Sequence, residues 1–163
     1  MGTQHLSQMI AAIKNRQIIH LIYNKDWEND QSECELLPLL LKEFKGRWYV
    51  LAKRLSDAKI RTYSLDRVVS FSLLNKHGTP PEGVAHYFDN CFGIFSKDTL
   101  QPEEVVLRFT KEAGKFVKEA MLHASQEIIS ETDKEISIRL HLLVTLDFIM
   151  ELLSYGESLE VIA

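Results

Sequence analysis

The sequence lacks any long apolar segment. No run approaches the roughly 20 apolar residues that a membrane-spanning helix needs. The N-terminal residues MGTQHLSQM do not show the basic-then-apolar pattern of a secretory signal. These two absences argue against a membrane protein and against export through a signal peptide. We therefore expect a cytoplasmic protein with no membrane partner.

Cysteine is scarce, and the familiar metal-binding and nucleotide-binding motifs are missing. The two cysteines, Cys34 and Cys91, lie far apart and form no CxxC pair, which excludes a disulfide framework and the common zinc motifs. The six histidines show neither HxxxH nor HExxH spacing, and the chain contains no GxGxxG, GxxxxGK[ST] or GxSxG sequence. The sequence therefore predicts reduced thiols, no cofactor, no metal site and no catalytic residues.

Acidic residues are few in one region of an otherwise acidic chain. Residues 45–71 contain seven Lys/Arg but only two acids, Asp57 and Asp66, which gives a net charge of +5. The rest of the chain contains 12 Lys/Arg and 21 Asp/Glu, a net charge of −9, which argues against broad, nonspecific duplex binding. Aromatic side chains such as Trp48 and Tyr49 interrupt the basic region. Because arginine, lysine and aromatic residues suit phosphates and stacked bases, this region is a candidate anionic-ligand site.

Hydrophobic patterns in the first half predict one helix followed by strands. Residues 3–16 repeat apolar side chains at helical spacing, and the polar residues 25–33 predict a turn. The segments expected to form strands are residues 17–24, 34–44, 48–55 and a stretch that starts at residue 60. Pro38 would place its strand at a sheet edge or break it in two. Short strands with short turns predict a small, highly bent antiparallel sheet or barrel.

The second half begins with a change of composition. Residues 77–103 contain three of the four prolines and are expected to form a linker with one packed aromatic stretch, Tyr87 to Phe95. The following residues alternate in the order β-α-β-β-α-β, the order of a ferredoxin-like half-sandwich, and Gly156 is expected to end the last helix. The predicted class is α+β. Its expected divisions are residues 1–76 for the helix and barrel, 77–103 for the linker and 104–163 for the ferredoxin-like domain.

The basic region resembles the signature of the WYL domain family, which is named for a Trp-Tyr-Leu triplet. Here the triplet reads Trp48-Tyr49-Val50, inside GRWYVLAKR, and IRTYSLDRVVSF follows it. The segments AAIKNRQIIHLIY, LLPLLL and FDNCFGIFS resemble the family's helix-plus-strand start, its proline-containing strand and the linker after its barrel. VVLRF, HASQ and LSYGESLEVI resemble its C-terminal extension, so the resemblance covers essentially the whole chain.

The resemblance implies an Sm-like (SH3-type) small barrel followed by the ferredoxin-like extension. Such chains are usually the effector-sensing part of bacterial transcriptional regulators, and they are thought to bind nucleic-acid or nucleotide-like ligands. An N-terminal winged helix-turn-helix domain normally precedes them and reads the DNA operator. That domain is absent from this sequence, so we expect either a truncated regulator or a stand-alone ligand-binding protein. Two positions depart from the family pattern: Val50 replaces the Leu of the triplet, and Ser64 replaces a basic residue.

The resemblance and the basic pattern together select the candidate ligand-binding residues. They are Tyr23, Tyr49, Lys53, Arg61, Tyr63, Ser64 and Arg67. Alternation along the strand places Trp48 and Val50 on one face and Tyr49 and Leu51 on the other. We expect Trp48 in the core, whereas Tyr23 and Tyr49 either pack or contact the ligand.

Two arginines at the next predicted strand, Arg61 and Arg67, each have two alternative roles. Arg61, Tyr63 and Leu65 fall on one side of it, and Leu65 is expected to be buried. An inward-facing Arg61 therefore needs either a carboxylate partner such as Asp66 or an anionic ligand. Arg67 either contacts the ligand or braces Asp66. Side chains near the turn are expected to form mostly a solvated rim: Lys53, Arg54 and Lys59.

The leading functional hypothesis is a non-enzymatic ligand-sensing module of a bacterial transcriptional regulator. Its ligand would be a single-stranded nucleic acid or a nucleotide-like molecule, and occupancy would change how two subunits pair. The first alternative is a dimerisation or protein-interaction domain without a small ligand. The second is a nucleotide-processing enzyme, against which the lack of paired carboxylates and metal ligands argues.

Two smaller expectations concern the second half. A homodimer is expected because bacterial regulators read two-fold operators as symmetric pairs, with exposed apolar positions such as Leu143 available for pairing. The HASQ segment, His123 to Gln126, is expected to form a turn whose serine and glutamine satisfy backbone groups, with a regulatory contact as the alternative.

Overall fold

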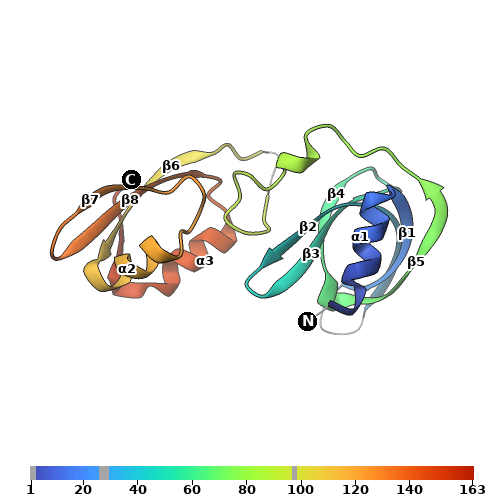
Figure 1. Ribbon diagram of the computed structural model, residues 1–163, viewed down its shortest axis with the longest axis horizontal. Coiled ribbons are helices and arrows are strands. Elements are labelled where there is room, and N and C mark those ends of the chain that lie inside the picture. The colour runs from blue at the N-terminus through green and yellow to red at the C-terminus, as the bar shows by residue number, and fades with distance from the viewer. Residues whose placement is uncertain (1–2, 26–29, 97–98) are drawn as a thin grey trace. The chain divides into compact units, whose positions relative to one another are not determined.

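The chain folds into two compact units, each built on an antiparallel sheet. The structure is a computed structural model that describes residues 3–25, 30–96 and 99–163. The units are Met1–His86 and Tyr87–Ala163, so the division falls inside the segment 77–103 that the sequence predicts as a linker. Both sheets carry only one or two short α-helices (Figure 1), and the predicted α+β class is therefore confirmed. No helix in the described part of the chain is long and apolar enough to cross a bilayer.

The described residues of the first unit form one α-helix and five strands. Its elements are the 3₁₀ turn η1 (Thr3–His5), α1 (Leu6–Lys14), β1 (Gln17–Asn24), β2 (Gln31–Phe44), β3 (Arg47–Arg54), β4 (Ile60–Ser64), the 3₁₀ turn η2 (Leu65–Arg67), β5 (Val68–His77) and the 3₁₀ turn η3 (Val84–His86). The strands form one sheet in the order β4-β3-β2-β1-β5, and every neighbouring pair is antiparallel, as predicted. The η2 turn divides the last predicted strand into β4 and β5. Residues 26–29 of the predicted turn lie outside the described residues.

Apolar side chains from α1 and from one face of the sheet form the core of the first unit. Met9 and Ala12 of α1 are fully buried against Leu21 of β1 and Leu36 of β2. The sheet curves around α1 (Figure 1), so the helix closes one side of this core. Trp48 packs against the same cluster, as predicted. Burial of each large aliphatic side chain contributes about 1.5–3 kcal/mol, which holds the helix on the sheet.

The face of β2 and β3 that points away from the α1 core is also partly covered. Leu37 and Leu51 are almost completely buried, although their neighbours along each strand point into the core. The chain after β5 supplies this cover, since η3 contacts β2 and Gly78 lies against Leu37. A Cβ at Gly78 would come within 2.8 Å of Leu37 Cδ2, so the backbone approaches closely here because the residue has no side chain.

Pro38 lies in the central strand of the sheet, and the prediction of an edge strand or a break is wrong. β2 runs without interruption from Gln31 to Phe44 between β1 and β3. The pairing with β1 ends at Leu36, before the proline, and the pairing with β3 shifts register between Pro38 and Leu40. The missing N–H of proline therefore falls where one ladder has ended and the other has a bulge, which removes its usual cost.

A tight hairpin connects β2 to β3 and brings the basic region into the sheet. Lys45 and Gly46 both have positive φ, 49° and 75°, and Phe44 pairs with Arg47 across the turn. Two positive φ values in a two-residue loop are typical of the type I′ turn, whose twist matches antiparallel strands. The short connection between the predicted strands 34–44 and 48–55 is therefore confirmed.

The first sheet has two free edges among the described residues. β4 and β5 are its outer strands, and no described pairing joins them. The structure therefore shows a curved antiparallel sheet packed against a helix, and the Sm-like closure of that sheet into a barrel stays a prediction.

In the second unit, the part of the chain that the structure describes forms four strands and two α-helices. Its elements are β6 (Glu103–Thr110), α2 (Lys111–Glu119), β7 (Glu127–Glu131), β8 (Glu135–Leu142), α3 (Leu146–Ser154), the 3₁₀ turn η4 (Gly156–Ser158) and β9 (Leu159–Val161). This is the predicted order β-α-β-β-α-β, and the antiparallel sheet has the strand order β7-β8-β6-β9. Both helices lie on one face of the sheet (Figure 1), where Val117 of α2 and Phe148 of α3 share a core with β6 and β8.

The alternation predicted for β8 holds on its inner face. Ile136, Ile138, Leu140 and Leu142 are fully buried, and Arg139 and His141 on the outer face are exposed. Ser137 departs from the pattern because it is only 7% exposed on the outer face. The predicted end of α3 is confirmed, since Gly156 follows the helix with a φ of +53°, in the left-handed region that glycine adopts without strain.

The aromatic stretch Tyr87 to Phe95 docks on the second unit, as predicted. The Phe92 ring lies 5.6 Å from the ring of Phe148, and Asp147 accepts hydrogen bonds from the backbone N–H groups of Ile94 and Phe95. The backbone N–H of Leu143 donates to the Asn90 carbonyl at 2.8 Å. Leu143 is only 7% exposed, so the prediction that it offers an exposed pairing position is wrong: the docked aromatic stretch covers this part of the chain.

Candidate functional site

The β3–β4 hairpin divides the predicted site residues between two faces. Residues directly opposite each other in an antiparallel pair share a face. Tyr63 is opposite Val50 and Arg61 is opposite Ala52, so Tyr63 and Arg61 follow the core face. Tyr49 is opposite Ser64, and this pair lies on the other face together with Lys53. The seven predicted residues therefore do not form one cluster.

Two tyrosines form the centre of the core-face group. The rings of Tyr23 and Tyr63 pack edge to face with centroids 5.2 Å apart, and each residue is only 8% exposed. The Tyr23 hydroxyl accepts a hydrogen bond of 3.1 Å from the backbone N–H of Ser64, which ties β1 to the end of β4. Burial raises the pKa of the Tyr23 hydroxyl, and this hydrogen bond and the Arg67 charge oppose the rise. Of the two roles open to Tyr23, the structure shows packing.

Arg67 lies at one end of this group. Its guanidinium carbon is 5.1 Å from the centroid of the Tyr23 ring, within the range of a cation–π interaction. Its Nε donates to the backbone carbonyl of Asn24 at 2.9 Å. Arg67 therefore braces the end of β1, and the alternative that it braces Asp66 is not what the structure shows.

Arg61 lies at the other end and shares a carboxylate with Arg54. The Nη2 of Arg61 donates to Asp57 Oδ2 at 2.9 Å, and Arg54 donates to both oxygens of the same carboxylate. The hydrogen bond from Arg54 is the main reason that the pKa of Asp57 lies well below its usual range, and the backbone N–H of Lys59 and the Arg61 guanidinium add to the effect. Asp57 is therefore ionised at every physiological pH.

The predicted partner of Arg61, Asp66, is wrong. Asp66 faces Arg47 instead, with 3.9 Å between Arg47 Nε and Asp66 Oδ2. The physical reason lies in the hairpin: the β3–β4 turn places Asp57 between Arg54 and Arg61, whereas the η2 turn carries Asp66 away from β4. The only sequence signal for this arrangement was an acid in the turn between two arginine-bearing strands.

The residues that form the core-face group are a continuous chain of contacts, which we name the arginine–tyrosine row. It consists of Arg67, Tyr23, Tyr63 and Arg61. Arg61 lies next to Tyr63 at the end of the row, where its positive charge opposes the rise in the pKa of the Tyr63 hydroxyl. Burial is the main cause that raises the pKa of this hydroxyl, and nearby Cys34 adds to the rise. Both tyrosines are therefore neutral, and the charge of the row comes from its two arginines.

At each end of the row, one guanidinium N–H group has no hydrogen-bond acceptor among the described residues. Arg61 Nη1 and Arg67 Nη2 are shielded from solvent and have no hydrogen-bond acceptor within the part of the chain that the structure describes. A buried donor that stays unpaired costs about 1–3 kcal/mol, and more when it is charged. Buried polar groups usually have a partner. These two donors are therefore the feature of the row that an anionic ligand would satisfy.

Cys34 lies beside the row and was not predicted as part of the site. Its pairing with Leu21 places it on the core face of β2, where it packs against the first core. Burial raises the pKa of the Cys34 thiol, whereas the Tyr63 hydroxyl and the charges of Arg54 and Arg61 oppose the rise. The thiol is free and protonated at neutral pH, so it lines the row as a small, weakly polar group.

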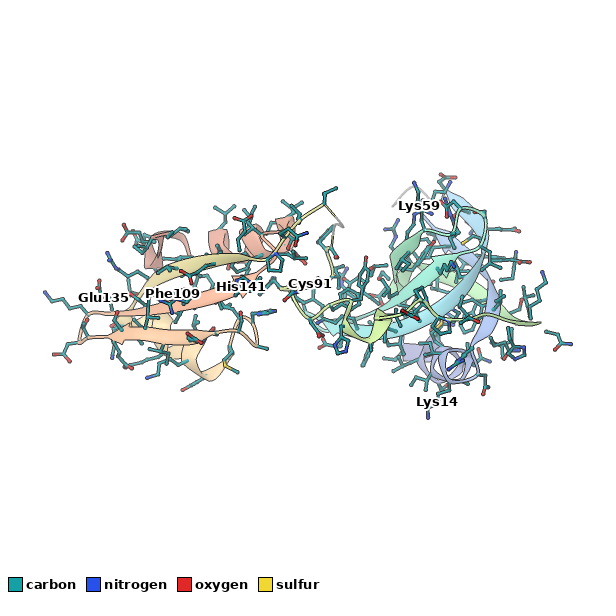
Figure 2. All side chains as sticks on the ribbon, turned by 90° about the horizontal axis from the view of Figure 1, so that it is seen from above. Lys14, Lys59, Cys91, Phe109, Glu135 and His141 are labelled. Carbon is teal, nitrogen blue, oxygen red and sulfur yellow. The ribbon has the colours of Figure 1, made fainter. Side chains whose placement is uncertain are left out.

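The outer-face candidates have weaker support from the geometry. Tyr49 and Ser64 are half-buried, and Lys53 forms no ion pair with another described residue. Lys59 projects at the turn, on the opposite side of the first unit from Lys14 (Figure 2), so the basic end of α1 does not extend this surface. Arg54 was expected in the solvated rim, but it forms an ion pair with Asp57.

The HASQ turn has the structural role that the sequence predicts. The Ser125 hydroxyl accepts from the backbone N–H of His141 at 2.9 Å, and the Gln126 side chain bridges the Leu122 N–H and the Val117 carbonyl. His123 contacts the Asp89 carbonyl through Nε2 at 2.9 Å. Because a carbonyl only accepts, Nε2 carries the proton of this imidazole. The turn thus fixes the aromatic stretch to the second unit.

Comparisons with known proteins match one family model to each of the two units. The family model of the WYL domain matches residues 4–73, and that of the WCX domain matches residues 101–163. No curated protein matches the sequence significantly. The structure is similar to Proteasome accessory factor B/C (PafBC) of Arthrobacter aurescens, with 18% identity and a TM-score of 0.45. It is also similar to a CRISPR Cas-related protein, with 13% identity and a TM-score of 0.56, which indicates a shared fold.

Both solved structures are longer than this chain. The similarity covers 99% of this chain in each case, but 24% of the PafBC chain and 48% of the CRISPR Cas-related chain. The chain thus spans about a quarter and about half of their respective lengths. The two family models match in sequence order, cover most of the chain, and place the arginine–tyrosine row inside the first of them. The protein therefore belongs to the WYL domain family.

Proposed function

We propose that this chain is the non-enzymatic ligand-sensing module of a bacterial transcriptional regulator. Its ligand is a single-stranded nucleic acid or a nucleotide-like molecule, and it binds at the arginine–tyrosine row. The observation that carries the proposal is the pair of buried guanidinium donors, Arg61 Nη1 and Arg67 Nη2, that have no acceptor among the described residues. Family membership supports the regulatory context.

The geometry favours recognition of phosphate over stacking of bases on the row itself. Tyr23 and Tyr63 are buried, so their rings orient the arginines and offer little surface to a base. A guanidinium presents a planar fork of donors that matches phosphate oxygens in a bidentate manner. Arg54 and Arg61 share the single carboxylate of Asp57, so the local charge stays positive. Lys53, Ser64 and the half-buried ring of Tyr49 would extend recognition over the other face of the hairpin.

The proposal includes the finer description of the fold and the assembly. The curved sheet around α1 supports an Sm-like barrel, and the strand order β7-β8-β6-β9 with both helices on one face supports a ferredoxin-like second unit. The regulator would act as a homodimer, because operators with two-fold symmetry are read by symmetric pairs. The proposal assigns no operator contact to residues 1–163.

The test replaces Arg61 and measures binding of a single-stranded oligonucleotide at several salt concentrations. Arg61→Ala is expected to weaken binding by about 1.5–3 kcal/mol, the range for a hydrogen bond to a charged group. The slope of log affinity against log salt should shrink by about 0.7 if one phosphate contact is lost. Arg61→Lys keeps the charge but not the fork, so it should recover the slope and only part of the affinity.

Lys59→Ala is the matched control, because Lys59 lies in the same hairpin but outside the row. It removes one positive charge and is expected to change affinity only slightly. Thermal unfolding of each variant shows whether the fold is intact. A folded Arg61→Ala protein with unchanged affinity and unchanged salt slope would overturn the ligand role and leave the protein-interaction alternative.

A further inference from the structure

The second unit carries a helix that is apolar on nearly all sides. Only two residues of α3 are charged, Asp147 and Glu151, and Asp147 is buried where it holds the aromatic stretch. Four large apolar side chains of the helix are exposed: Leu146 by 60%, Ile149 by 41%, Met150 by 61% and Leu153 by 73%. A helix that is hydrophobic all round normally lies inside a protein or an interface. This surface of α3 therefore lacks the cover that its composition predicts.

A groove of about 480 Å³ runs beside this helix. Ile149, Leu152 and Leu153 of α3 form one wall, and Leu159 and Val161 of the edge strand β9 form the other. We name this feature the α3–β9 groove. Its volume is in the range of ordinary binding sites, and contiguous exposed apolar surface of this kind marks interaction sites.

The groove lies in the layer that the helices occupy. α2 and α3 cover one face of the sheet, and β9 is the strand at one edge of that sheet. The groove beside α3 is thus the position of a further helix in a helix-on-sheet layer. A helical segment would bury its apolar side chains against α3 and β9 in the same way that the two resident helices bury theirs.

The charged side chains that line the groove are acidic, and one of them, Glu104, is paired with Arg139. Glu103 and Glu104 line it, and residues 140–163 contain four Asp/Glu but no Lys or Arg. No described Lys or Arg lines the groove: Arg139 of β8 pairs with Glu104 from outside the lining, and Lys111 and Lys118 pair with Glu131. The complement of an apolar groove with an acidic rim is an apolar helix face with basic flanks.

We propose that the α3–β9 groove binds an amphipathic helix of a partner protein, with Leu- or Ile-type side chains facing the groove and Lys or Arg beside them. A second copy of this chain is a poorer occupant, because a symmetric contact would bring the acidic rims together. The site lies in the second unit and does not depend on the arginine–tyrosine row, so this proposal and the proposed function can fail independently.

The test uses the whole chain and a synthetic helical peptide of about 18 residues, or five helical turns. The peptide carries leucines at i, i+3, i+4 and i+7 spacing with lysines on both sides of the apolar stripe. Comparison peptides replace the lysines by glutamates, or place a proline at the centre. The basic peptide is expected to bind, whereas the acidic peptide should bind at least tenfold more weakly and the proline peptide should not bind measurably.

Two variants of the protein locate the site. Leu153→Ser is expected to weaken the basic peptide about tenfold or more because it removes an apolar wall, and the fold should survive because the side chain is largely exposed. Glu103→Gln should weaken binding several-fold and reduce its salt dependence. Met121→Ser is the matched control, since Met121 is 62% exposed in the same unit but does not line the groove, and it should leave binding unchanged.

Four outcomes would overturn the proposal. The first is that the basic peptide does not bind, and the second is that the acidic peptide binds as tightly as the basic one. The third is that the proline peptide binds as tightly as the basic one, as expected for a peptide that adds as a strand. The fourth is that Met121→Ser loses as much affinity as Leu153→Ser. Sedimentation gives a fifth: a dimer that Leu153→Ser dissociates would show that the groove is occupied by a second copy.

Discussion

The arginines of the two units differ in the number of carboxylates that lie next to them. In the first unit, Arg54 and Arg61 share the single carboxylate of Asp57, and Arg67 contacts no described carboxylate at all. In the second unit the arginines are the shared partners: Arg139 lies between Glu104 and Glu127, and Arg108 lies between Glu135 and Glu160. In the first unit two guanidinium groups thus share one carboxylate, whereas in the second unit each of these two arginines faces two carboxylates.

Under the two proposals, this difference in charge matches each unit to a different kind of partner. Residues 87–163 contain seven Lys/Arg against 14 Asp/Glu, so an anionic ligand is repelled there. Unpaired guanidinium donors attract phosphate, whereas an acidic rim around an apolar helix attracts a basic, apolar partner. A module with both surfaces can bind a nucleotide-like ligand and a protein segment without competition for one site. Three experiments would break or sharpen this contrast.

The largest effect is expected from the core of the second unit. Phe148→Ala removes a fully buried ring and should lower the free energy of unfolding of that unit by about 3–5 kcal/mol. Trp48 packs against the core of the first unit and residues 87–163 contain no tryptophan, so tryptophan fluorescence does not report on the second unit. In urea, the circular dichroism transition should move to lower concentration while the fluorescence midpoint stays in place.

Leu21→Ala is the reverse control, because Leu21 is fully buried in the first core. It should lower the fluorescence midpoint, with a cost of about 2–5 kcal/mol. If Phe148→Ala shifts the fluorescence and the circular dichroism transitions equally, the two units unfold as one and the contrast between them does not extend to stability.

A smaller effect is expected from the carboxylate that the first unit's arginines share. Asp57→Asn removes the negative charge between Arg54 and Arg61. Affinity for a single-stranded oligonucleotide should rise about threefold to fivefold at low salt, and the gain should fade as salt screens the patch. Fluorescence anisotropy at several salt concentrations measures both quantities.

Asp133→Asn provides a control with the same change in net charge, placed in the β7–β8 turn of the acidic unit. It should leave the affinity unchanged within error. A loss of affinity in Asp57→Asn would mean that Asp57 orients Arg61 for the ligand more than it competes with the ligand.

The smallest effect concerns titration in the second unit. Hydrogen bonds from Lys111 and Lys118 lower the pKa of Glu131 from 4.5 to about 2. Because the folded pKa is depressed, the contribution to stability is complete above pH 4.5 and is lost as the pH falls through about 2. The carboxyl carbon of Glu131, followed by NMR, should titrate near pH 2 in the native protein.

Lys118→Gln should move that midpoint upward, toward 4.5, without reaching it, because Lys111 remains in place. The variant should unfold at nearly the same temperature at neutral pH, since exposed ion pairs contribute little. A midpoint near 4.5 in the native protein would show that these lysines do not hold the carboxylate in solution.

Much of the fold follows from local patterns in the sequence. β1 has the predicted bounds of 17–24, and the alternation of residues 135–144 identified the buried face of β8. The tight connection at Lys45, Gly46 and Arg47 was readable from the glycine between two apolar segments, and Gly46 adopts the positive φ that glycine allows. The position of Pro38 in the sheet was predicted wrongly because proline's missing N–H is costly only where a neighbouring strand pairs with it. That pairing depends on the whole sheet and cannot be read from one strand.

The candidate site was predicted in composition but not in arrangement. The basic region and the strands that carry it were both found, yet the hairpin register puts Tyr49, Lys53 and Ser64 on the face away from Arg61. Asp57 was not recognised as the partner of Arg61, because a long side chain can reach several acids and only the turn decides which one is close. Leu143 was expected at the surface because the docking position of the aromatic stretch has no local signal.

The sequence by itself determined the α+β class, the order of strands and helices in the second half, and the excess of positive charge in residues 45–71. These features depend on composition and on the fixed periods of strands and helices, which are properties of the local backbone. Only the tertiary structure decided which arginines keep a free donor, which tyrosines are buried beside them, and which face of α3 is left uncovered. Those properties depend on strand order, register and turn geometry, which bring together residues that are distant along the chain.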